Sequence, residues 1–565
     1  MNDIRRSILW VVFVFSLIMI WDKWQLHNGK PATFFPDPQR DAAALSAQAP
    51  SPTGAASTPA QSGVPAASGL AAAVPAANAS LPEAAAPALA AGSIISLENE
   101  NLKLDFSSIG GNIVRAELKK YAAIGEPANS PKKFVLLDES SERVYRAESG
   151  LAGSNYPNHL SAMSASTSVS PEGQQVRFES PEQSGIKLIK TYTLPAKGYA
   201  LQVRHEVINT SGAPLSPELY LQLTRDGNKP PGDSRIYSTF TGPAFYTAEK
   251  KYQKVDFSKI EEKDAKYEKT SAQGYVSMVQ HYFASAWLLD DAHKNQKIAR
   301  ENYVSKVSTN LYAAGMKTAL PVLQAGQRES IDNTLYVGPQ DEAALEALYP
   351  GLEAVKDYGI FTILSKPLFN LMLFLHGFLG NWGWTIVALV VLLKIALYWL
   401  NAKAYSSMAK MKAVTPRITE MRERLKDKPQ EMQMEMMRIY KEEKVNPVGG
   451  CLPMLAQIPI FISLYWVLLS SVEFRGAPWM GWITDLSAAD PYFILPLLMT
   501  ATSLLQVWLN PKPPDPTQAK LMWMMPLVFS VMFFFFPSGL VLYWLTNNIL
   551  SIAQQWIINR RLGVN

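Results

Sequence analysis

The sequence predicts an α-helical membrane bundle of five core spans with an N-terminal signal-anchor span, a large exported antiparallel β-sandwich domain and a cytoplasmic helical hairpin. Three observations predict this fold class. Long apolar runs lie at the N-terminus and in the last third of the chain. Between them, residues 93–340 alternate polar and apolar side chains, and residues 402–446 form a basic segment without any apolar run. At 565 residues the chain is also too long for a single hydrophobic core.

Residues 1–30 have the composition of a signal-anchor span. Arg5 and Arg6 precede an apolar run from Ile8 to Trp21. No small-x-small cleavage site follows the run, so we expect an uncleaved anchor with a cytoplasmic N-terminus. A cleaved signal peptide is the alternative. The next segment, residues 31–92, is rich in Ala, Pro, Ser and Gly, and it has too few large apolar side chains to form a core. We therefore expect a disordered tether.

Residues 93–340 read as the β-sandwich domain. Segments 185–194 and 199–208 alternate with a period of two and are expected to pair across the turn at 195–198. Segments 101–106 and 218–223 show the same alternation, which predicts strands with water on their outer faces. The aromatic and histidine side chains of this domain either line a ligand cleft or fill the core and the strand faces, and the second interpretation is favoured.

Residues 341–380 are expected to form interfacial helices. Segment 341–355 is amphipathic. Segment 361–379 is apolar but is interrupted by Lys366, Pro367, Asn370 and His376, which suits a helix that lies in the outer interface better than one that spans the bilayer.

Residues 381–565 form the predicted five-span core. The spans are expected at residues 382–401, 451–472, 492–509, 521–536 and 539–558. Span 521–536 is short for a bilayer, so it is expected to thin the membrane locally. The basic residues of segment 402–446 and the C-terminal Arg560 and Arg561 place both on the cytoplasmic side.

The cytoplasmic segment 402–446 is predicted to be a helical hairpin. An apolar stripe runs through the first helix at steps of three and four, and a second helix is expected at 430–444 after a break at 427–429. Its Met-rich seam either closes the hairpin or offers an adaptable contact surface. The stripe comprises Met408, Met411, Val414, Ile418, Met421 and Leu425.

Lys394 places a positive charge inside the span 382–401. An isolated ammonium at that depth costs several kcal/mol. Either its stem snorkels to an interface marked by Tyr398 and Trp399, or it lies in a polar, cytoplasm-facing pocket of the bundle. The other spans also carry polar groups that lipid disfavours. These are Gln457, Thr500, Ser503, Gln506, Thr546 and Asn547.

We expect these polar groups to turn inward and to line a wet cationic groove. The five spans contain no acidic residue, so none of them offers Lys394 an ion pair. A groove of this kind attracts the acidic tail of another chain, while neighbouring apolar side chains offer its helix a hydrophobic slide. The candidate slide residues are Phe461, Ile462, Phe533, Phe534, Tyr543 and Trp544.

Other functions have less support in the sequence. The histidines show no ligand spacing, so no metal or other cofactor is expected, and the single cysteine, Cys451, excludes an internal disulfide. No catalytic constellation occurs in the spans, so we do not expect an enzyme. A polar-groove secondary transporter with an exported sensor domain is the main rival, although transporters usually carry membrane carboxylates. A scaffold for other membrane subunits is a third interpretation.

Several motifs resemble those of the YidC/Oxa-type membrane protein insertases, in their Gram-negative form. They cover residues 355–560 in order. The motifs are Tyr405-Ser-Ser-Met-Ala-Lys-Met411, Glu442-Glu-Lys-Val-Asn-Pro-Val-Gly-Gly-Cys-Leu-Pro453, Gln457-Ile-Pro-Ile-Phe461, Asp485-Leu-Ser-Ala-Ala-Asp-Pro491 and Phe536-Pro-Ser-Gly-Leu-Val-Leu-Tyr543.

The resemblance implies an inner-membrane protein whose exported domain is a periplasmic, non-catalytic supersandwich of the sugar-mutarotase type. It also implies a groove that is open to the cytoplasm and to lipid but closed to the outside. Lys394 falls where this family usually has an Arg. Lysine keeps the positive charge but lacks the planar guanidinium that binds both oxygens of a carboxylate.

The implied partners are nascent membrane proteins, components of the Sec translocon, the lipid bilayer, and ribosomes or targeting factors at the cytoplasmic face. The hairpin residues expected to make the cytoplasmic contacts are Met408, Lys410, Met411, Arg422 and Arg424.

Overall fold

The computed structural model describes residues 92–153, 155–230, 239–289, 298–425, 428–443, 452–510 and 516–561. The predicted anchor, and the tether except for its last residue, lie outside these ranges. The described chain forms two compact units. One runs from Gly92 to Asp357 and includes Ser470–Glu473, and the other contains residues 358–469 and the residues from Phe474 onward.

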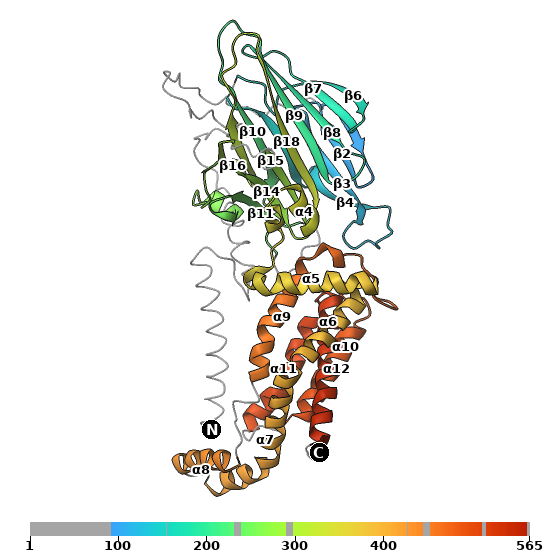
Figure 1. Ribbon diagram of the computed structural model, residues 1–565, viewed down its shortest axis with the longest axis vertical. Helices are drawn as coiled ribbons and strands as arrows, with labels where there is room; N and C mark the ends of the chain where they lie inside the picture. The colour runs from blue at the N-terminus through green and yellow to red at the C-terminus, as the bar shows by residue number, and fades with distance from the viewer. Residues whose placement is uncertain are drawn as a thin grey trace, which may run out of the picture. The chain divides into compact units, whose positions relative to one another are not determined.

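The first unit is a sandwich of two nine-stranded sheets, and all pairings between its strands are antiparallel. The order of the first sheet is β1-β2-β3-β4-β5-β10-β17-β16-β13, and that of the second is β12-β11-β14-β15-β18-β9-β8-β7-β6 (Figure 1). The predicted sandwich is therefore confirmed. The strands are β1 (Ile94–Glu98), β2 (Leu102–Ser107), β3 (Asn112–Ala122), β4 (Lys133–Glu139), β5 (Val144–Leu151), β6 (Ser164–Ser170), β7 (Gly173–Glu179), β8 (Ile186–Leu194), β9 (Ala200–Asn209), β10 (Glu218–Asp226), β11 (Gly242–Thr247), β12 (Lys251–Lys254), β13 (Thr270–Ser271), β14 (Gly274–Gln280), β15 (Phe283–Leu289), β16 (Arg300–Ser308), β17 (Leu311–Ala319) and β18 (Arg328–Pro339).

Alternating apolar side chains of both sheets form one core. On β8 and β9, Leu188, Val203 and Val207 are fully or almost fully buried, and the hairpin pairs Thr193 with Gln202 as its sequence predicts. Three short helices complete the unit: α3 (Phe257–Glu261), α4 (Glu342–Leu348) and η1 (Leu352–Val355).

The expectation that β10 has one face in water is wrong. Every residue of β10 is buried, including Gln222 and Thr224. The strand lies in the middle of its sheet, and its polar side is covered from the same domain: the Tyr220 hydroxyl bonds to His159, and the Tyr303 hydroxyl donates to Gln222 Oε1 at 2.7 Å. Local periodicity predicts a strand but not this cover, which comes from residues far away in the sequence.

The second unit is helical. Figure 1 shows α5 lying crosswise to the ends of α6, α9, α10 and α12. The unit contains η2 (Gly359–Phe361), α5 (Thr362–Leu379), α6 (Trp382–Ala396), α7 (Tyr398–Arg424), α8 (Pro429–Glu442), α9 (Leu452–Ser470), α10 (Ile494–Leu509), α11 (Pro516–Phe533) and α12 (Ser538–Arg561), and the 3-10 turn η3 (Val472–Phe474) follows α9.

Among the described helices, only α5 has both the length and the apolar composition to cross a bilayer by itself, and the bent pair α6–α7 passes as one span. Segments of α9, α10 and α11 are shorter apolar helices.

Two predicted spans differ from the structure. The span 382–401 is not one straight helix, because α6 ends at Ala396 and α7 begins at Tyr398 with a bend of 63° between them. Neither Pro nor Gly marks this bend, and at the start of α7 Gln554 Nε2 of α12 donates to Tyr398 O at 3.5 Å. The span 521–536 ends early, at Phe533, because Pro537 disfavours helical backbone before it.

Candidate functional site

The side chain of Lys394 contacts helix α12. It lies in the last turn of α6, where Nζ donates to Ser551 Oγ at 2.7 Å. Ser551 Oγ in turn donates to Asn547 O, one turn earlier, at 2.7 Å. One hydroxyl of α12 therefore joins α6 to α12 at the ammonium.

No carboxylate pairs with Lys394 in the part of the chain that the structure describes. The sequences of α6, α9, α10, α11 and α12 contain no Asp or Glu. Lys394 is half-buried, and among the described residues its ammonium bonds to a neutral hydroxyl. A cation with one neutral partner retains most of its attraction for an acidic group.

Tyr543, Asn547 and Ser551 recur every four residues and so form one stripe on α12. At its other end, Gln457 Nε2 of α9 donates to the Tyr543 hydroxyl at 3.1 Å. The structure thus brings Lys394, Gln457 and Asn547, all predicted from the sequence, to one polar stripe. Ser551 was not predicted, because a lone serine in an apolar helix usually bonds only to its own backbone. Its spacing from Asn547 is the signal that identifies it.

The other predicted polar residues lie elsewhere. Ser503 of α10 accepts from Asn548 Nδ2 at 2.8 Å, in the seam between α10 and α12. Thr500 donates to Pro496 O of its own helix at 2.8 Å. Thr546 is buried and Gln506 is half-buried. Asn548 was missed by the sequence reasoning, although it follows Asn547 directly.

Aromatic side chains surround the Tyr543 end of the stripe. The Phe461 ring centroid lies 4.6 Å from Trp544, and the Phe533 centroid lies 5.6 Å from Trp544. Phe533 and Tyr543 are buried, whereas Phe461, Ile462 and Trp544 are half-buried. Phe534 is also half-buried, and its ring centroid lies 5.4 Å from that of Phe493 instead. We call Phe461, Phe533, Tyr543 and Trp544 the aromatic cluster.

The hairpin of α7 and α8 is closed by the stripe that the sequence predicts. Val414, Ile418 and Met421 are buried against Ile439, and Met411 and Leu425 pack beside them. The side chain of Met408 is not among the side chains that the structure describes. Lys410 and Arg424 are exposed, Arg422 is half-buried, and Met434 and Met437 of α8 are 67% and 63% exposed. The methionines therefore divide between the seam and an outer surface.

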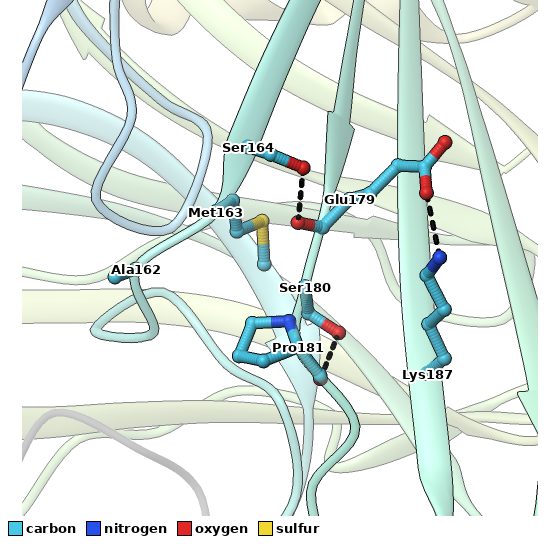
Figure 2. A pocket seen from close by; sticks show the side chains of 7 residues that line it. All are labelled: Ala162, Met163, Ser164, Glu179, Ser180, Pro181 and Lys187. Atoms are coloured by element: carbon cyan, nitrogen blue, oxygen red, sulfur yellow. Dashed lines mark hydrogen bonds and ion pairs between the residues drawn. The ribbon is translucent and has the colours of Figure 1, made fainter.

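Two histidines of the sandwich, His159 and His205, are packed in its interior rather than arranged around a cleft. His205 is fully buried between Ser149 Oγ at 2.8 Å and Asn333 Nδ2 at 2.9 Å, and burial holds its pKa well below the usual range. His159 is buried against Tyr220, and burial also lowers its pKa. A shallow hollow of about 380 Å³ lies apart from them, at one end of β6 (Figure 2).

A second buried polar group centres on Glu148. Burial raises the pKa of this carboxyl, but the Arg146 guanidinium, His159 and the hydrogen bonds from Thr224 and Gln222 together outweigh burial, and the net value is about 2. Glu148 also accepts from Thr224 Oγ1 at 2.6 Å and from Gln222 Nε2 at 2.5 Å. The group is fully bonded, so it stabilises the sandwich and leaves no open ligand site there.

Comparison with known proteins agrees with this architecture. Residues 94–371 match the family model "YidC periplasmic domain", and residues 374–564 match "60Kd inner membrane protein". The membrane protein insertase YidC of Cupriavidus necator is 48% identical over 99% of this chain and 98% of its own length. The chain belongs to the YidC family of membrane protein insertases.

Another YidC, from Bordetella petrii, is 48% identical over 99% of this chain and 98% of its own length. A crystal structure of an active YidC insertase with its first transmembrane domain resolved matches with a TM-score of 0.36 at 16% identity, covering 82% of this chain and 94% of that chain. As a YidC family member, the chain is a non-enzymatic insertase of the inner membrane with a periplasmic domain, and nascent membrane proteins are its substrates.

Proposed function

We propose that Lys394 captures the acidic hydrophilic tail of a nascent membrane protein in a groove that is open to the cytoplasm. The observation that carries this proposal is the unpaired charge: Lys394 donates to Ser551 and has no carboxylate partner in the described chain. An entering Asp or Glu would supply the counter-charge that the bundle lacks.

The α12 stripe extends the binding surface beyond the ammonium. The Asn547 amide and the Ser551 and Tyr543 hydroxyls offer hydrogen bonds to a polar tail, which lowers the cost of moving its backbone away from bulk water. We propose that Gln457 contributes to the same surface, since it bonds to Tyr543. Ser503 joins α10 to α12 through Asn548, so its proposed role is to hold these helices together, whereas Thr500 bonds to the backbone of its own helix.

The aromatic cluster is proposed to guide the apolar helix of the substrate towards lipid. Phe461, Ile462, Phe534 and Trp544 are the half-buried members of the predicted slide and offer the accessible part of it. The buried rings of Phe533 and Tyr543 pack against Trp544 and Phe461, respectively. Apolar contact of this kind is non-directional and so accepts substrates of different sequence.

The exposed face of the hairpin is proposed to meet ribosomes or targeting factors. Lys410 and Arg424 supply positive charge, and Met434 and Met437 supply adaptable apolar surface. The positive-inside distribution places this hairpin and the C-terminus in the cytoplasm, with the N-terminus on the same side. We also propose that the protein acts either alone or together with the Sec translocon.

A charge series at position 394 tests the capture step. In cells depleted of the native insertase, we expect Lys394→Ala to reduce protease protection of a substrate's acidic translocated tail at least tenfold. Lys394→Arg should preserve protection, because the charge remains. Lys520→Ala, which removes an exposed lysine of α11, is the matched control and should have no effect.

The substrate's charge provides the second arm of this test. A version of the same substrate whose tail has Asn and Gln in place of Asp and Glu should respond less to Lys394→Ala. Full insertion of the acidic substrate by Lys394→Ala would contradict the capture step and would leave hydrophobic sliding as the mechanism. A net solute flux through purified protein in vesicles would favour a transporter instead.

A further inference from the structure

Strand β6 is an unprotected edge of the sandwich. It forms the last strand of the second sheet, and within the described ranges it pairs only with β7. Figure 1 shows β6 at the margin of this sheet. Six of its seven residues are exposed, and Val169 is 83% exposed. The strand contains neither charge nor proline, the two features that natural proteins use most often to block pairing at an edge.

The other three edges of the sandwich are protected. Strand β13 has two residues, which is too short to pair. Strand β12 has four residues and carries a lysine at each end, and Lys251 has a positive φ of 56°. Strand β1 has five residues and ends with Glu98. The lack of protection is therefore particular to β6.

The apolar side of β6 lies on the inner side of its sheet. Ala165 and Thr167 pair with Phe178 and Val176 of β7, both of which are fully buried in the core. Side chains directly opposite each other in a sheet point to the same face. The inner face of β6 thus continues the core surface, but the opposite sheet no longer covers it.

The backbone groups of the same residues point outwards. β6 and β7 are joined by the two-residue turn Pro171-Glu172, so the flanking pair Ser170 and Gly173 is hydrogen-bonded and the pairs alternate from there. Ser164, Ser166, Ser168 and Ser170 then bond to β7. Ala165, Thr167 and Val169 direct their N–H and C=O groups away from the sheet.

The sequence of β6 is complementary to itself. It reads Ser-Ala-Ser-Thr-Ser-Val-Ser, with Thr167 at its centre. In an antiparallel pair of two copies, Thr167 meets Thr167, Ala165 meets Val169, and serine meets serine at the remaining positions. Cross-strand Thr–Thr pairs and small apolar pairs are favourable, and no like charges face each other.

We propose that two copies of this chain associate through β6, joined edge to edge around a two-fold axis at Thr167. The outward-facing residues then form three hydrogen-bonded pairs, and each pair exchanges about two backbone hydrogen bonds. The result is one continuous sheet across both sandwiches, with Ala165 and Val169 of each copy covered by the other.

The hollow of Figure 2 lies at the start of β6, where the open edge ends. There Met163 N donates to Ser108 O at 2.9 Å and Ala162 bridges Ile109, so residues 108–109 already pair with the chain just before β6. The open edge therefore begins at Ala165. The second copy pairs along Ala165, Thr167 and Val169, and its Pro171-Glu172 turn bends away from residues 108–109.

A single strand per copy covers less than the roughly 800 Å² per partner that stable soluble complexes bury. Both copies are held in one membrane, which raises their effective concentration without any further contact. The association is therefore a property of the protein in the membrane and weakens on dilution into detergent.

Thiol cross-linking in membranes tests both the contact and its register. The full chain carries one native cysteine, so Cys451→Ser gives a background without thiols. In this background Thr167→Cys should yield a cross-linked dimer with a short bifunctional reagent. Ala165→Cys and Val169→Cys should each cross-link poorly alone but efficiently when the two variants are expressed together. Ser141→Cys, exposed in the β4–β5 loop, is the matched control and should remain monomeric.

Two results would overturn the proposal. The absence of a Thr167→Cys dimer in membranes, while the same thiol reacts with a monofunctional reagent, would show that the edge is free. A cross-link to a protein of different mass would show that another chain pairs with β6.

A charge exchange at the axis gives independent evidence. Thr167→Lys and Thr167→Glu each place like charges opposite one another, and we expect each to abolish co-purification of two differently tagged copies that are extracted together with their native lipids, without detergent. Mixing Thr167→Lys with Thr167→Glu should restore co-purification. Failure of restoration, with both variants folded and active in insertion, would reject the two-fold register.

Discussion

Buried ionic groups dominate the behaviour of the sandwich at the scale of single residues. Glu148 is 1% exposed and depends on Arg146 for its charge. Removing one partner of such a pair leaves a buried charge without compensation, which costs about 3–5 kcal/mol. Thr224 and Gln222 also donate to this carboxylate, but they are neutral and cannot replace the guanidinium.

We therefore expect Arg146→Met to lower the free energy of unfolding of the sandwich by about 3 kcal/mol. Urea denaturation of the detergent-solubilised chain measures this change. Arg115→Met is the matched control: Arg115 forms an ion pair with Asp138 at 3.1 Å but is 43% exposed, so its loss should cost less than about 1 kcal/mol. Equal effects of the two substitutions would contradict the buried-charge argument.

His159 and His205 make the sandwich sensitive to acid. Burial lowers the pKa of both imidazoles, so on acidification the unfolded chain binds protons that the folded chain does not. Stability is then complete above the unfolded pKa of about 6.5 and falls as the pH drops below it. We expect a loss of about 1 kcal/mol per histidine between pH 7.5 and pH 5.5, measured as a shift of the urea midpoint.

A substitution at His205 tests whether this histidine causes the acid sensitivity. Asn333 Nδ2 donates to His205 Nδ1, so the neutral ring carries its proton on Nε2 and donates to Ser149. His205→Gln removes the titrating group while keeping polar atoms in its place. The variant should lose about half of the pH dependence, and an unchanged dependence would assign it to other groups.

At the scale of elements, close packing fixes how the helices begin. α6 starts against the loop that contains Trp479: a Cβ added at Gly383 would lie 2.2 Å from the Trp479 ring. Only glycine permits this approach, and the Asn381 side chain holds the same loop by donating to Pro478 O and Trp479 O, both at 3.1 Å.

We expect Gly383→Ala to destabilise the bundle by about 1–3 kcal/mol, because alanine forces the helix away from the loop. The change is measured as a lower melting temperature by tryptophan fluorescence in detergent. Gly377→Ala is the matched control, since an added Cβ meets nothing within 4 Å there. In the last turn of α5 it should be neutral or slightly stabilising.

The comparison of sequence and structure also belongs to this scale. Local patterns predicted the β8–β9 hairpin and the stripe at Val414, Ile418 and Met421, because the neighbours in these elements are close in sequence. They did not predict the bend after Ala396, nor the cover over β10, which depends on distant residues.

For the candidate site, the charge at Lys394 was evident from composition alone. Its partner Ser551 follows 157 positions later and carried only the weak signal of its spacing on α12.

At the scale of the whole molecule, a buried ion pair joins distant parts of the chain within the first unit. Lys356 Nζ donates to both carboxylate oxygens of Glu473, at 3.2 and 3.3 Å, and the lysine side chain is inaccessible. Burial lowers the pKa of Lys356 and raises that of Glu473, while their mutual attraction opposes both shifts.

We expect Lys356→Met and Glu473→Leu each to cost about 3 kcal/mol, because each leaves its partner buried and charged. The double variant should cost clearly less than the sum of the two, which defines the coupling between the residues. Thermal unfolding in detergent gives the three values. Additive losses would show that the pair contributes no coupling.

Ser470–Glu473 also bears on the order of assembly. These residues directly follow α9, yet they belong to the same unit as residues 92–357, and Val472 is part of the sandwich core. During synthesis the sandwich strands emerge more than one hundred residues before this short segment does. The periplasmic fold is therefore completed only after α9 has been synthesised and the residues that follow it have reached the sandwich. Completion of the exported domain thus indicates that α9 has been inserted.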